Sequence, residues 1–348
     1  MNRESSASAR QADSLLADWR GRALALEDGV NRAMVGLERP VRLVLIALFA
    51  RGHVLLEGDV GVGKTTLLRA LARGIGGVYE RLEGTIDLLP NDLIYYTYIN
   101  EQGRPQVDPG PLLKHGEDLS FFFFNEINRA RPQVHSLLLR VMAERSVSAF
   151  NREYRFPHLQ VFADRNRVEK EETFEIPSAA RDRFFMEIPI ELTQDRELRR
   201  SLMFDTRFHD ADALIARVQS GIIPFAQVKD IGPLIQQEIG VSETLETYAL
   251  DLWEATRDPE RFGVVIEDVD MSQLVQAGAS PRGASLLIRA AKVAAWLNDR
   301  ETVVPEDVQS IFFETMTHRV FFNPVYELRR AMLARQMMEQ ILSQVASP

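Results

Sequence analysis

The chain contains no cysteine, which excludes disulfides, thiol catalysis and cysteine-ligated zinc. It also lacks long apolar runs. No stretch approaches the roughly 20 residues that span a bilayer, and residues 1–20 lack the apolar core of a signal peptide. Positive charge is in deficit, with 41 Lys and Arg against 50 Asp and Glu. We therefore expect a cytoplasmic protein with no membrane span and no sequence-independent binding to nucleic acid.

Six histidines are present, but none has the spacing of a metal-binding motif.

A glycine-rich segment follows the first predicted strand. Residues 53–57 form a short apolar run typical of a buried strand, and residues 58–65 fit G-x-x-x-x-G-K-[ST], the phosphate-binding loop. Glycines let backbone N–H groups approach a phosphate closely, and the helical pattern after the loop places a helix N-terminus at the anion. No guanine-reading Asn-Lys-x-Asp motif is present, so ATP is the expected nucleotide. The residues expected to bind it are Gly58, Asp59, Val60, Gly61, Val62, Gly63, Lys64, Thr65 and Thr66.

A second buried strand carries the groups that hydrolysis requires. Residues 119–124 are continuously apolar, as in a central strand covered on both faces, and the run ends at Asn125 and Glu126. We expect Glu126 to be the general base for the attacking water. Lys64 would contact the β- and γ-phosphates, and the Thr65 hydroxyl would bind Mg²⁺.

The order of these elements predicts the fold class. Strands alternate with helices up to about residue 190, which indicates an α/β fold with a parallel sheet, and the pattern beyond residue 192 is helical. Residues 1–12 are polar and Ser-rich, so we expect a frayed terminus before a helix over residues 15–37. A last helix is expected from Pro324. Its apolar stripe would pack in the core or between subunits, with a partner-docking face as the alternative; it comprises Val325, Leu328, Met332, Leu333, Met337, Ile341 and Val345.

Taken together, an ordered series of short motifs resembles the MoxR family of AAA+ ATPases, in the helix-2-insert clade. The resemblance covers about residues 30–320. Its matching stretches are 53–58, the phosphate loop, 87–92, 109–112, 126–130, 176–179, 182–184 and 280–282.

The resemblance implies a P-loop NTPase core with a parallel sheet, followed by an all-α lid. The implied divisions are an N-terminal extension over residues 1–25, the nucleotide-binding core over 26–191, and the lid with the C-terminal helix over 192–348. Within the core, residues 92–108 would be the helix-2 insert and residues 146–158 the hairpin before sensor 1.

The resemblance also implies roles for single residues. Asn166 looks like sensor 1, which positions water against the γ-phosphate. Arg183 looks like the arginine finger that enters the neighbouring subunit's site, with Arg181 as the weaker candidate. Arg282 looks like sensor 2 at the start of a lid helix. Positive groups of this kind stabilise the transferring phosphoryl group.

A finger supplied by a neighbour implies a homo-oligomeric ring, and we expect a hexamer. The leading hypothesis is an ATPase that remodels or activates a client protein, in the manner of a chaperone, together with a von Willebrand factor A-domain partner. A motor subunit of a metal chelatase and a slow or non-hydrolysing nucleotide-gated scaffold are the alternatives.

Two motifs depart from the family pattern. The family normally has Asp-Glu after the second buried strand, whereas this chain has Asn125 and Glu126. An amide polarises the hydration shell of Mg²⁺ less well than a carboxylate, so we expect Asn125 to act on the metal only indirectly and turnover to be slow. Residues 164–167 read Asp-Arg-Asn-Arg where the family usually has Thr-Gln-Asn-Pro. The charged neighbours of Asn166 leave the local geometry open at this point.

Overall fold

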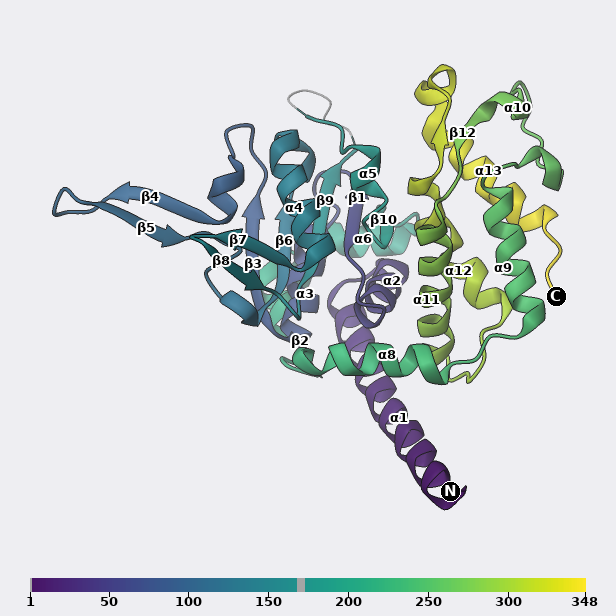
Figure 1. Cartoon of the computed structure of the whole chain (residues 1–348), viewed down its shortest axis with the longest axis horizontal. Helices are drawn as coiled ribbons and strands as arrows, with labels where there is room; N and C mark the ends of the chain where they lie inside the picture. Colours follow the sequence, from purple (N-terminus) through teal and green to yellow (C-terminus); the bar gives the residue numbers. More distant parts are fainter. Residues whose placement is uncertain (1, 168–172) are drawn as a thin grey trace.

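One five-stranded parallel sheet organises the first half of the chain, and a helical part follows it (Figure 1). The structure, a computed structural model, describes residues 2–167 and 173–348. Neighbouring strands in the sheet follow the order β10-β1-β9-β6-β3, and every pairing is parallel. In chain order these strands are β1 (Val54–Gly58), β3 (Val78–Glu83), β6 (Leu119–Asn125), β9 (Gln160–Asn166) and β10 (Met186–Ile190). The predicted α/β class with a parallel sheet is confirmed.

The sheet is apolar on both faces because helices cover both. Every residue of β6 is buried, as its uninterrupted apolar sequence predicts for a strand between β9 and β3. Phe121 and Phe123 belong to the apolar cluster on one face, and Phe122 and Phe124 to the cluster on the other. The first face is covered by α1 (Asn2–Ala33), α2 (Glu38–Phe49) and α3 (Lys64–Gly74), and the second by α4 (Pro132–Glu144).

Two antiparallel hairpins extend the α/β part. The first pairs β4 (Tyr95–Ile99) with β5 (Pro105–Pro109) and projects from the sheet (Figure 1). The second pairs β7 (Ser146–Ala149) with β8 (Arg152–Arg155). The rings of Tyr95 and Phe150, with centroids 5.2 Å apart, join the first hairpin to the turn of the second.

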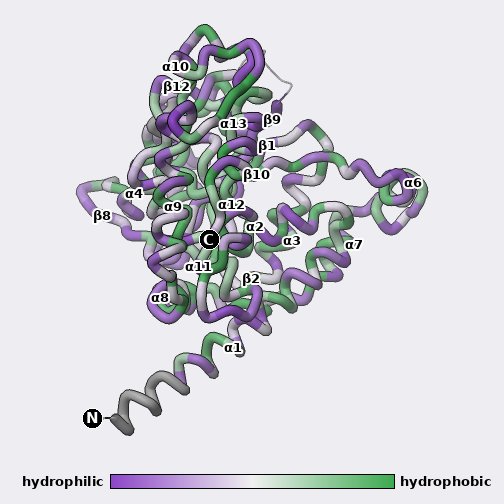
Figure 2. The backbone as a smooth tube through the Cα atoms, turned by 90° about the vertical axis from the view of Figure 1, so that its right-hand side faces the viewer, coloured by the Kyte–Doolittle hydropathy of each residue, from purple (hydrophilic) through white to green (hydrophobic). Residues whose placement is uncertain are grey.

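Short elements complete the description of this part. They are β2 (Ile75–Gly76), which pairs with β11 (Ile223–Pro224), and the helices α5 (Ser178–Arg181), α6 (Arg196–Phe204) and α7 (Ala211–Ala216). In the turned view of Figure 2, α6 stands apart from the body, and its Met203 and Phe204 are exposed.

The helical part packs directly against the α/β part. Its helices are α8 (Val228–Glu238), α9 (Glu243–Ala255), α10 (Met271–Leu274), α11 (Pro281–Leu297), α12 (Pro305–Met316) and α13 (Arg330–Gln344), and β12 (Val275–Ala277) pairs with β13 (Phe321–Phe322). Ser280 caps α11 by accepting the Gly283 N–H, a role for which serine is favoured. The rings of Phe49 on α2 and Trp296 on α11 lie 4.8 Å apart, within one continuous apolar cluster.

The N-terminus differs from the sequence-based expectation. Instead of a frayed segment, a single helix, α1, begins at Asn2 and ends at Ala33, and α2 follows after a short turn. From Leu16 onward its apolar side chains enter the main core, where Trp19 packs edge-on against Phe49. Among its described side chains, burial begins at Leu16, before residue 25.

The C-terminal stripe also differs from expectation. Residues 324–329 form a 3-10 helix, and the α-helix begins only at Arg330. The later members of the stripe, from Leu333 to Val345, are buried, but Val325, Leu328 and Met332 are exposed. Val325 and Leu328 lie in the 3-10 helix, outside the periodicity of α13, whereas Met332 lies on the exposed side of the first turn of α13. Within the described residues, no helix is both long and apolar enough to cross a membrane.

Candidate active site

The phosphate-binding sequence forms the turn between β1 and α3. Gly58 ends β1 so close to β10 that a Cβ atom would lie 2.3 Å from the Ile190 carbonyl oxygen. Gly61 and Gly63 have φ of 81° and 90°, in the left-handed region that favours glycine. Asp59 and Val60 at the turn are exposed, Val62 is half-buried, and Thr65 and Thr66 lie on the first turn of α3.

Lys64 links this loop to the neighbouring strand. Its side chain is buried, and its ammonium donates to the carbonyl oxygens of Gly58, at 2.8 Å, and Asp59, at 2.9 Å. It also donates to Asn166 Oδ1 at 2.7 Å. Because β9 lies between β1 and β6, Asn166 lies between Lys64 and the residues at the end of β6.

Glu126 completes the connection. The Asn166 amide nitrogen lies 3.3 Å from Glu126 Oε1, and Arg129 pairs with Glu126 Oε2 at 3.0 Å. Glu126 has φ of 51°, unusual for a residue with a side chain, as it leaves the end of β6. Gly84, at the end of β3, allows this path, since a Cβ there would lie 2.3 Å from the Glu126 carbonyl oxygen. The structure thus brings Lys64, Asn166 and Glu126 into one hydrogen-bonded chain.

A carboxylate and an amide lie side by side next to this chain. Asp164 is almost fully buried, and its Oδ1 accepts the Glu126 backbone N–H. With its nitrogen toward Asp164, the Asn125 amide donates to both carboxylate oxygens at 3.1 Å, while its oxygen accepts from Arg81 at 3.2 Å. This orientation is assigned because the opposite one sets the amide oxygen against the carboxylate. Burial raises the pKa of Asp164 to about 6, although the Glu126 N–H and the charge of Lys64 oppose this rise.

The two arginines beside Asn166 are neutralised on the other face of the sheet. Arg165 pairs with Glu57 at 3.2 Å and with Glu187, and Arg167 pairs with Glu191 at 3.1 Å. Successive residues of a strand point to opposite faces of the sheet. Asp164 and Asn166 therefore share the face of the phosphate loop, and the two arginines lie on the opposite face. Burial raises the pKa of Glu187, but Arg181 and Arg165 outweigh it and hold that pKa well below its ordinary value.

The three arginines implied by the family resemblance lie in different environments. Arg181 pairs with the buried Glu187 at 2.8 Å and is largely buried itself. Arg183 is half-buried, and its guanidinium makes no ion pair with the residues that the structure describes. Arg282, in the first turn of α11, lies 3.7 Å from Asp182. Within the same residues, no hydrogen bond or ion pair joins Arg183 or Arg282 to the phosphate loop.

The oxygen donors at this site fit Mg²⁺. The Thr65 hydroxyl directly follows Lys64, and the Asp164 and Glu126 carboxylates lie at the ends of the two strands beyond β1. Across residues 2–167 and 173–348, no three acidic or histidine side chains form a ready metal cage. Mg²⁺ needs no such cage, because it is commonly held by one or two protein oxygens together with substrate phosphates.

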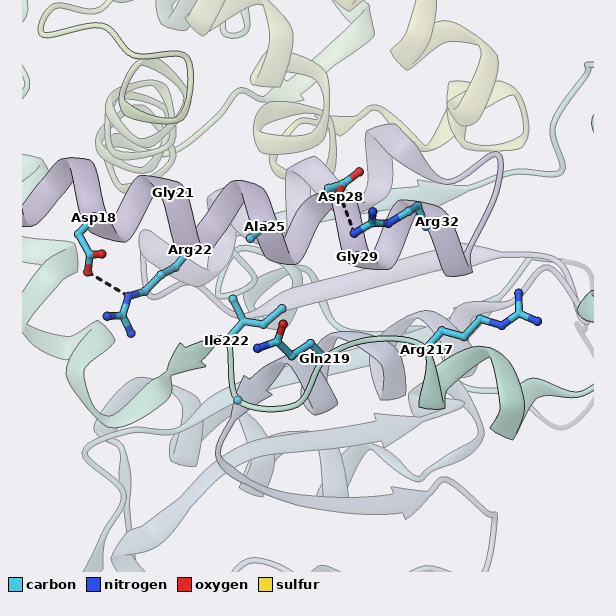
Figure 3. Close-up of a pocket in the computed structure, with 11 residues that line it drawn as sticks. Asp18, Gly21, Arg22, Ala25, Asp28, Gly29, Arg32, Arg217, Gln219 and Ile222 are labelled. Atoms are coloured by element: carbon cyan, nitrogen blue, oxygen red, sulfur yellow. Dashed lines mark hydrogen bonds and ion pairs between the residues drawn. The ribbon is translucent and has the colours of Figure 1, made fainter.

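A surface hollow elsewhere is unrelated to this site. It measures about 740 Å³ and lies between α1 and the segment after α7 (Figure 3). Its arginines Arg22 and Arg32 pair with Asp18 and Asp28 one helical turn away. None of the predicted nucleotide-binding residues lines it.

Sequence reasoning missed one residue of the site, Asp164. In the sequence Asp164 is visible as a departure from the family motif, 39 positions after Asn125, the residue that it contacts in the structure. The sequence nevertheless contains a signal. The expected acid is absent at the end of one strand, at Asn125, and an additional acid is present at the end of another strand, at Asp164. If these two strands pair, the two positions are predicted to be neighbours.

Comparisons with known proteins identify the family to which the chain is similar. The profile of the ATPase family associated with various cellular activities (AAA) matches residues 53–186, and that of the AAA lid domain matches residues 269–341. The chain is 58% identical to Protein MoxR from Methylorubrum extorquens over 339 residues, which cover 97% of this chain and 99% of that protein. It is 35% identical to Chaperone MoxR1 from Mycobacterium tuberculosis over 301 residues, covering 84% and 73% of the two chains.

A solved structure extends the likeness to the whole fold. The crystal structure of a protein from Cytophaga hutchinsonii, assigned as an ATPase, superposes with a TM-score of 0.82 at 31% identity, covering 98% of this chain and 99% of that one. Relatives of this identity and coverage, together with the matched ATPase and lid profiles, establish that the chain belongs to the MoxR family of AAA+ ATPases.

Proposed function

We propose that this protein is a cytoplasmic, Mg²⁺-dependent ATPase that works as a homo-oligomeric ring, expected to be a hexamer, and remodels a client protein. One observation carries the proposal: Lys64, Asn166 and Glu126 form a continuous hydrogen-bonded chain at the carboxyl ends of three adjacent parallel strands. Ligands of open α/β sheets bind at this edge. The client and a von Willebrand factor A-domain partner follow from the family resemblance.

Each residue has a defined part in the proposed reaction. The loop 58–66 binds the triphosphate through backbone N–H groups, and Lys64 contacts the β- and γ-phosphates. Glu126 takes a proton from the attacking water, which the Asn166 amide orients. The Thr65 hydroxyl would bind Mg²⁺, which would supply positive charge to neutralise the phosphates. Arg183 of a neighbouring subunit and Arg282 in cis contribute positive charge at the γ-phosphate.

The hairpins have a proposed part as well. The β4–β5 hairpin, within the proposed helix-2 insert 92–108, exposes Tyr96, Tyr98 and Ile99, and Tyr95 contacts the turn of the β7–β8 hairpin, within the proposed pre-sensor-1 segment 146–158. We propose that this joined pair faces the substrate or the pore of the ring. A movement of one hairpin would then reach the other through the contact between the Tyr95 and Phe150 rings.

Two substitutions test the ATPase proposal. Lys64→Met should weaken ATP binding by about 10-fold or more, since a charge-assisted contact to phosphate is lost. Glu126→Gln should keep ATP binding and slow turnover by about 10²–10⁴-fold, because the base is removed. Glu144→Gln, at an exposed position ending α4, is the control.

Turnover and ATP binding are measured separately, and native mass with ATP reports the ring. A wild-type protein that binds ATP without turning it over would favour the nucleotide-gated scaffold instead. A wild-type protein that binds no ATP would refute the proposal outright. Purification of associated proteins, with analysis of their cofactor content, separates a remodelling ATPase from a chelatase motor.

A further inference from the structure

Asp164 occupies a position that the proposed mechanism does not yet use. It is 2% exposed and lies on β9, the strand between the phosphate-loop strand β1 and the strand β6 that ends at Asn125. Asp164 and Asn166 are two residues apart, so they share one face of β9, and Asn166 on that face binds the Lys64 ammonium at 2.7 Å. The Asp164 carboxylate therefore faces the phosphate loop.

The contacts of Asp164 fix its direction. The Glu126 N–H and the Asn125 amide both donate to it, and Arg81 holds the other end of that amide at 3.2 Å. The charges that act on the carboxylate come from Lys64, Glu126 and Arg81. A buried carboxylate costs free energy unless it is paired, and these groups supply only part of its possible hydrogen bonds.

We propose that Asp164 is the carboxylate that orients the hydration shell of the Mg²⁺ accompanying the nucleotide, and that Asn125 is the amide that positions it. This inference rests on the proposed ATPase function. In this arrangement the acidic group lies on β9 and not at the end of the neighbouring strand β6, and it is hydrogen-bonded to Asn125 at that strand end. Asn125 alone predicts slow turnover. That expectation no longer applies if Asp164 has this role, because Asp164 and Glu126 together supply as many carboxylates as the Asp-Glu pair of the family.

The test exchanges the two groups. Asp164→Asn removes the carboxylate while conserving shape. Asn125→Asp combined with Asp164→Asn returns the carboxylate to β6 and conserves the net charge and the amide–carboxylate bond. Asn125→Asp alone would set two carboxylates 3.1 Å apart, where like charges force one to hold a proton. Asp13→Asn, on the exposed side of α1, is the control for the loss of one negative charge.

The readout is the ratio of affinities for the non-hydrolysable analogue AMP-PNP with Mg²⁺ and with EDTA. This ratio cancels any loss that weakens binding under both conditions, as a purely structural role would. Asp164→Asn should lower the ratio by about 10–100-fold, the usual effect of losing a group that orients metal ligands. The exchanged double variant should restore the affinity ratio to within about 3-fold of the wild-type ratio. Asn125→Asp alone should not raise the ratio above that of the wild type.

The possible outcomes distinguish a failure of this inference from a failure of the proposed ATPase function. A wild-type ratio in Asp164→Asn, or a double variant as impaired as the single one, would overturn the role of Asp164 while leaving ATP binding intact. Failure of the wild-type protein to bind AMP-PNP would refute the ATPase proposal itself. Thermal unfolding of each variant accompanies the titrations. If Asp164→Asn alone fails to fold, a double variant whose ratio falls more than about 3-fold below wild type overturns the role of Asp164.

Discussion

At the scale of single residues, His53 shows how burial fixes a protonation state. It precedes β1, where its Nδ1 accepts the Val161 N–H at 2.9 Å and its Nε2 lies 3.1 Å from the Met142 carbonyl oxygen. These partners require a neutral ring with the proton on Nε2. Protonation at Nδ1 would set two donors against each other. Burial, with a smaller contribution from the charge of Arg145, lowers the pKa of His53 to about 3.

Acid is therefore expected to destabilise the protein through His53. The unfolded chain, in which His53 titrates near pH 6.5, binds more protons than the folded chain between about pH 6.5 and about pH 3, so stability falls as pH falls through this window. From about pH 6.5 to about pH 5 the loss is about 1.6 kcal/mol. Above this window His53 contributes no pH dependence.

Urea unfolding of the wild type and of His53→Gln at several pH values measures this effect. Glutamine keeps one donor and one acceptor but does not titrate, so the difference between the two curves should shrink toward acid. Burial also lowers the pKa of His135 and His318, and both proteins share these contributions. Parallel curves would show that His53 is not responsible.

At the scale of elements, Asp182 joins the segment of Arg183 to the helical part. Its carboxylate pairs with the buried Arg319 at 3.1 Å and accepts from Ser280, the cap of α11, at 3.1 Å. Arg282 lies 3.7 Å away. One side chain thus ties the proposed finger and the proposed sensor 2 together within a subunit.

Removing the charge of Asp182 should loosen this junction. Asp182→Asn leaves the Arg319 guanidinium buried without its counter-charge, and we expect a loss of about 1–3 kcal/mol in the free energy of unfolding. The matched control is Asp212→Asn, which breaks an exposed pair with Arg69 and should cost less than about 1 kcal/mol. Denaturant unfolding compares the two variants, and equal losses would show that the junction is not held by this ion pair.

At the scale of the whole molecule, the unpaired state of Arg183 matters most. Arg181 is held by Glu187, whereas Arg183 makes no ion pair within the described residues. A guanidinium left available in this way suits contact with another copy of the chain. It favours Arg183 over Arg181 as the proposed finger.

Mixing two inactive variants tests action between subunits. Arg183→Ala keeps its own loop and base but lacks the finger, whereas Glu126→Gln keeps the finger but lacks the base. In a mixed ring, each Arg183→Ala site beside a Glu126→Gln neighbour should regain turnover, so the mixture should exceed both separate samples several-fold. Turnover that never exceeds the sum of the separate rates would place the finger in cis or elsewhere, and mixing with Lys64→Met is a second pairing for comparison.

The sequence by itself determined the local chemistry of this protein. The glycines at 58, 61 and 63, the lysine after them and the helical pattern beyond predict a phosphate loop, because tight turns and helix starts depend on a few adjacent residues. The apolar runs predicted the parallel sheet, since a strand buried on both faces needs such a sequence. The cap of α11 was likewise predictable from Ser280 and Pro281.

Only the tertiary structure decided which distant groups became neighbours. Strand order placed Asp164 against Asn125, side-chain pairing assigned Arg181 to Glu187, and core packing brought α1, from Leu16 onward, against α2. Each outcome depends on contacts between residues far apart in the chain. Local propensity carries no information about them, because it describes only a residue and those adjacent to it.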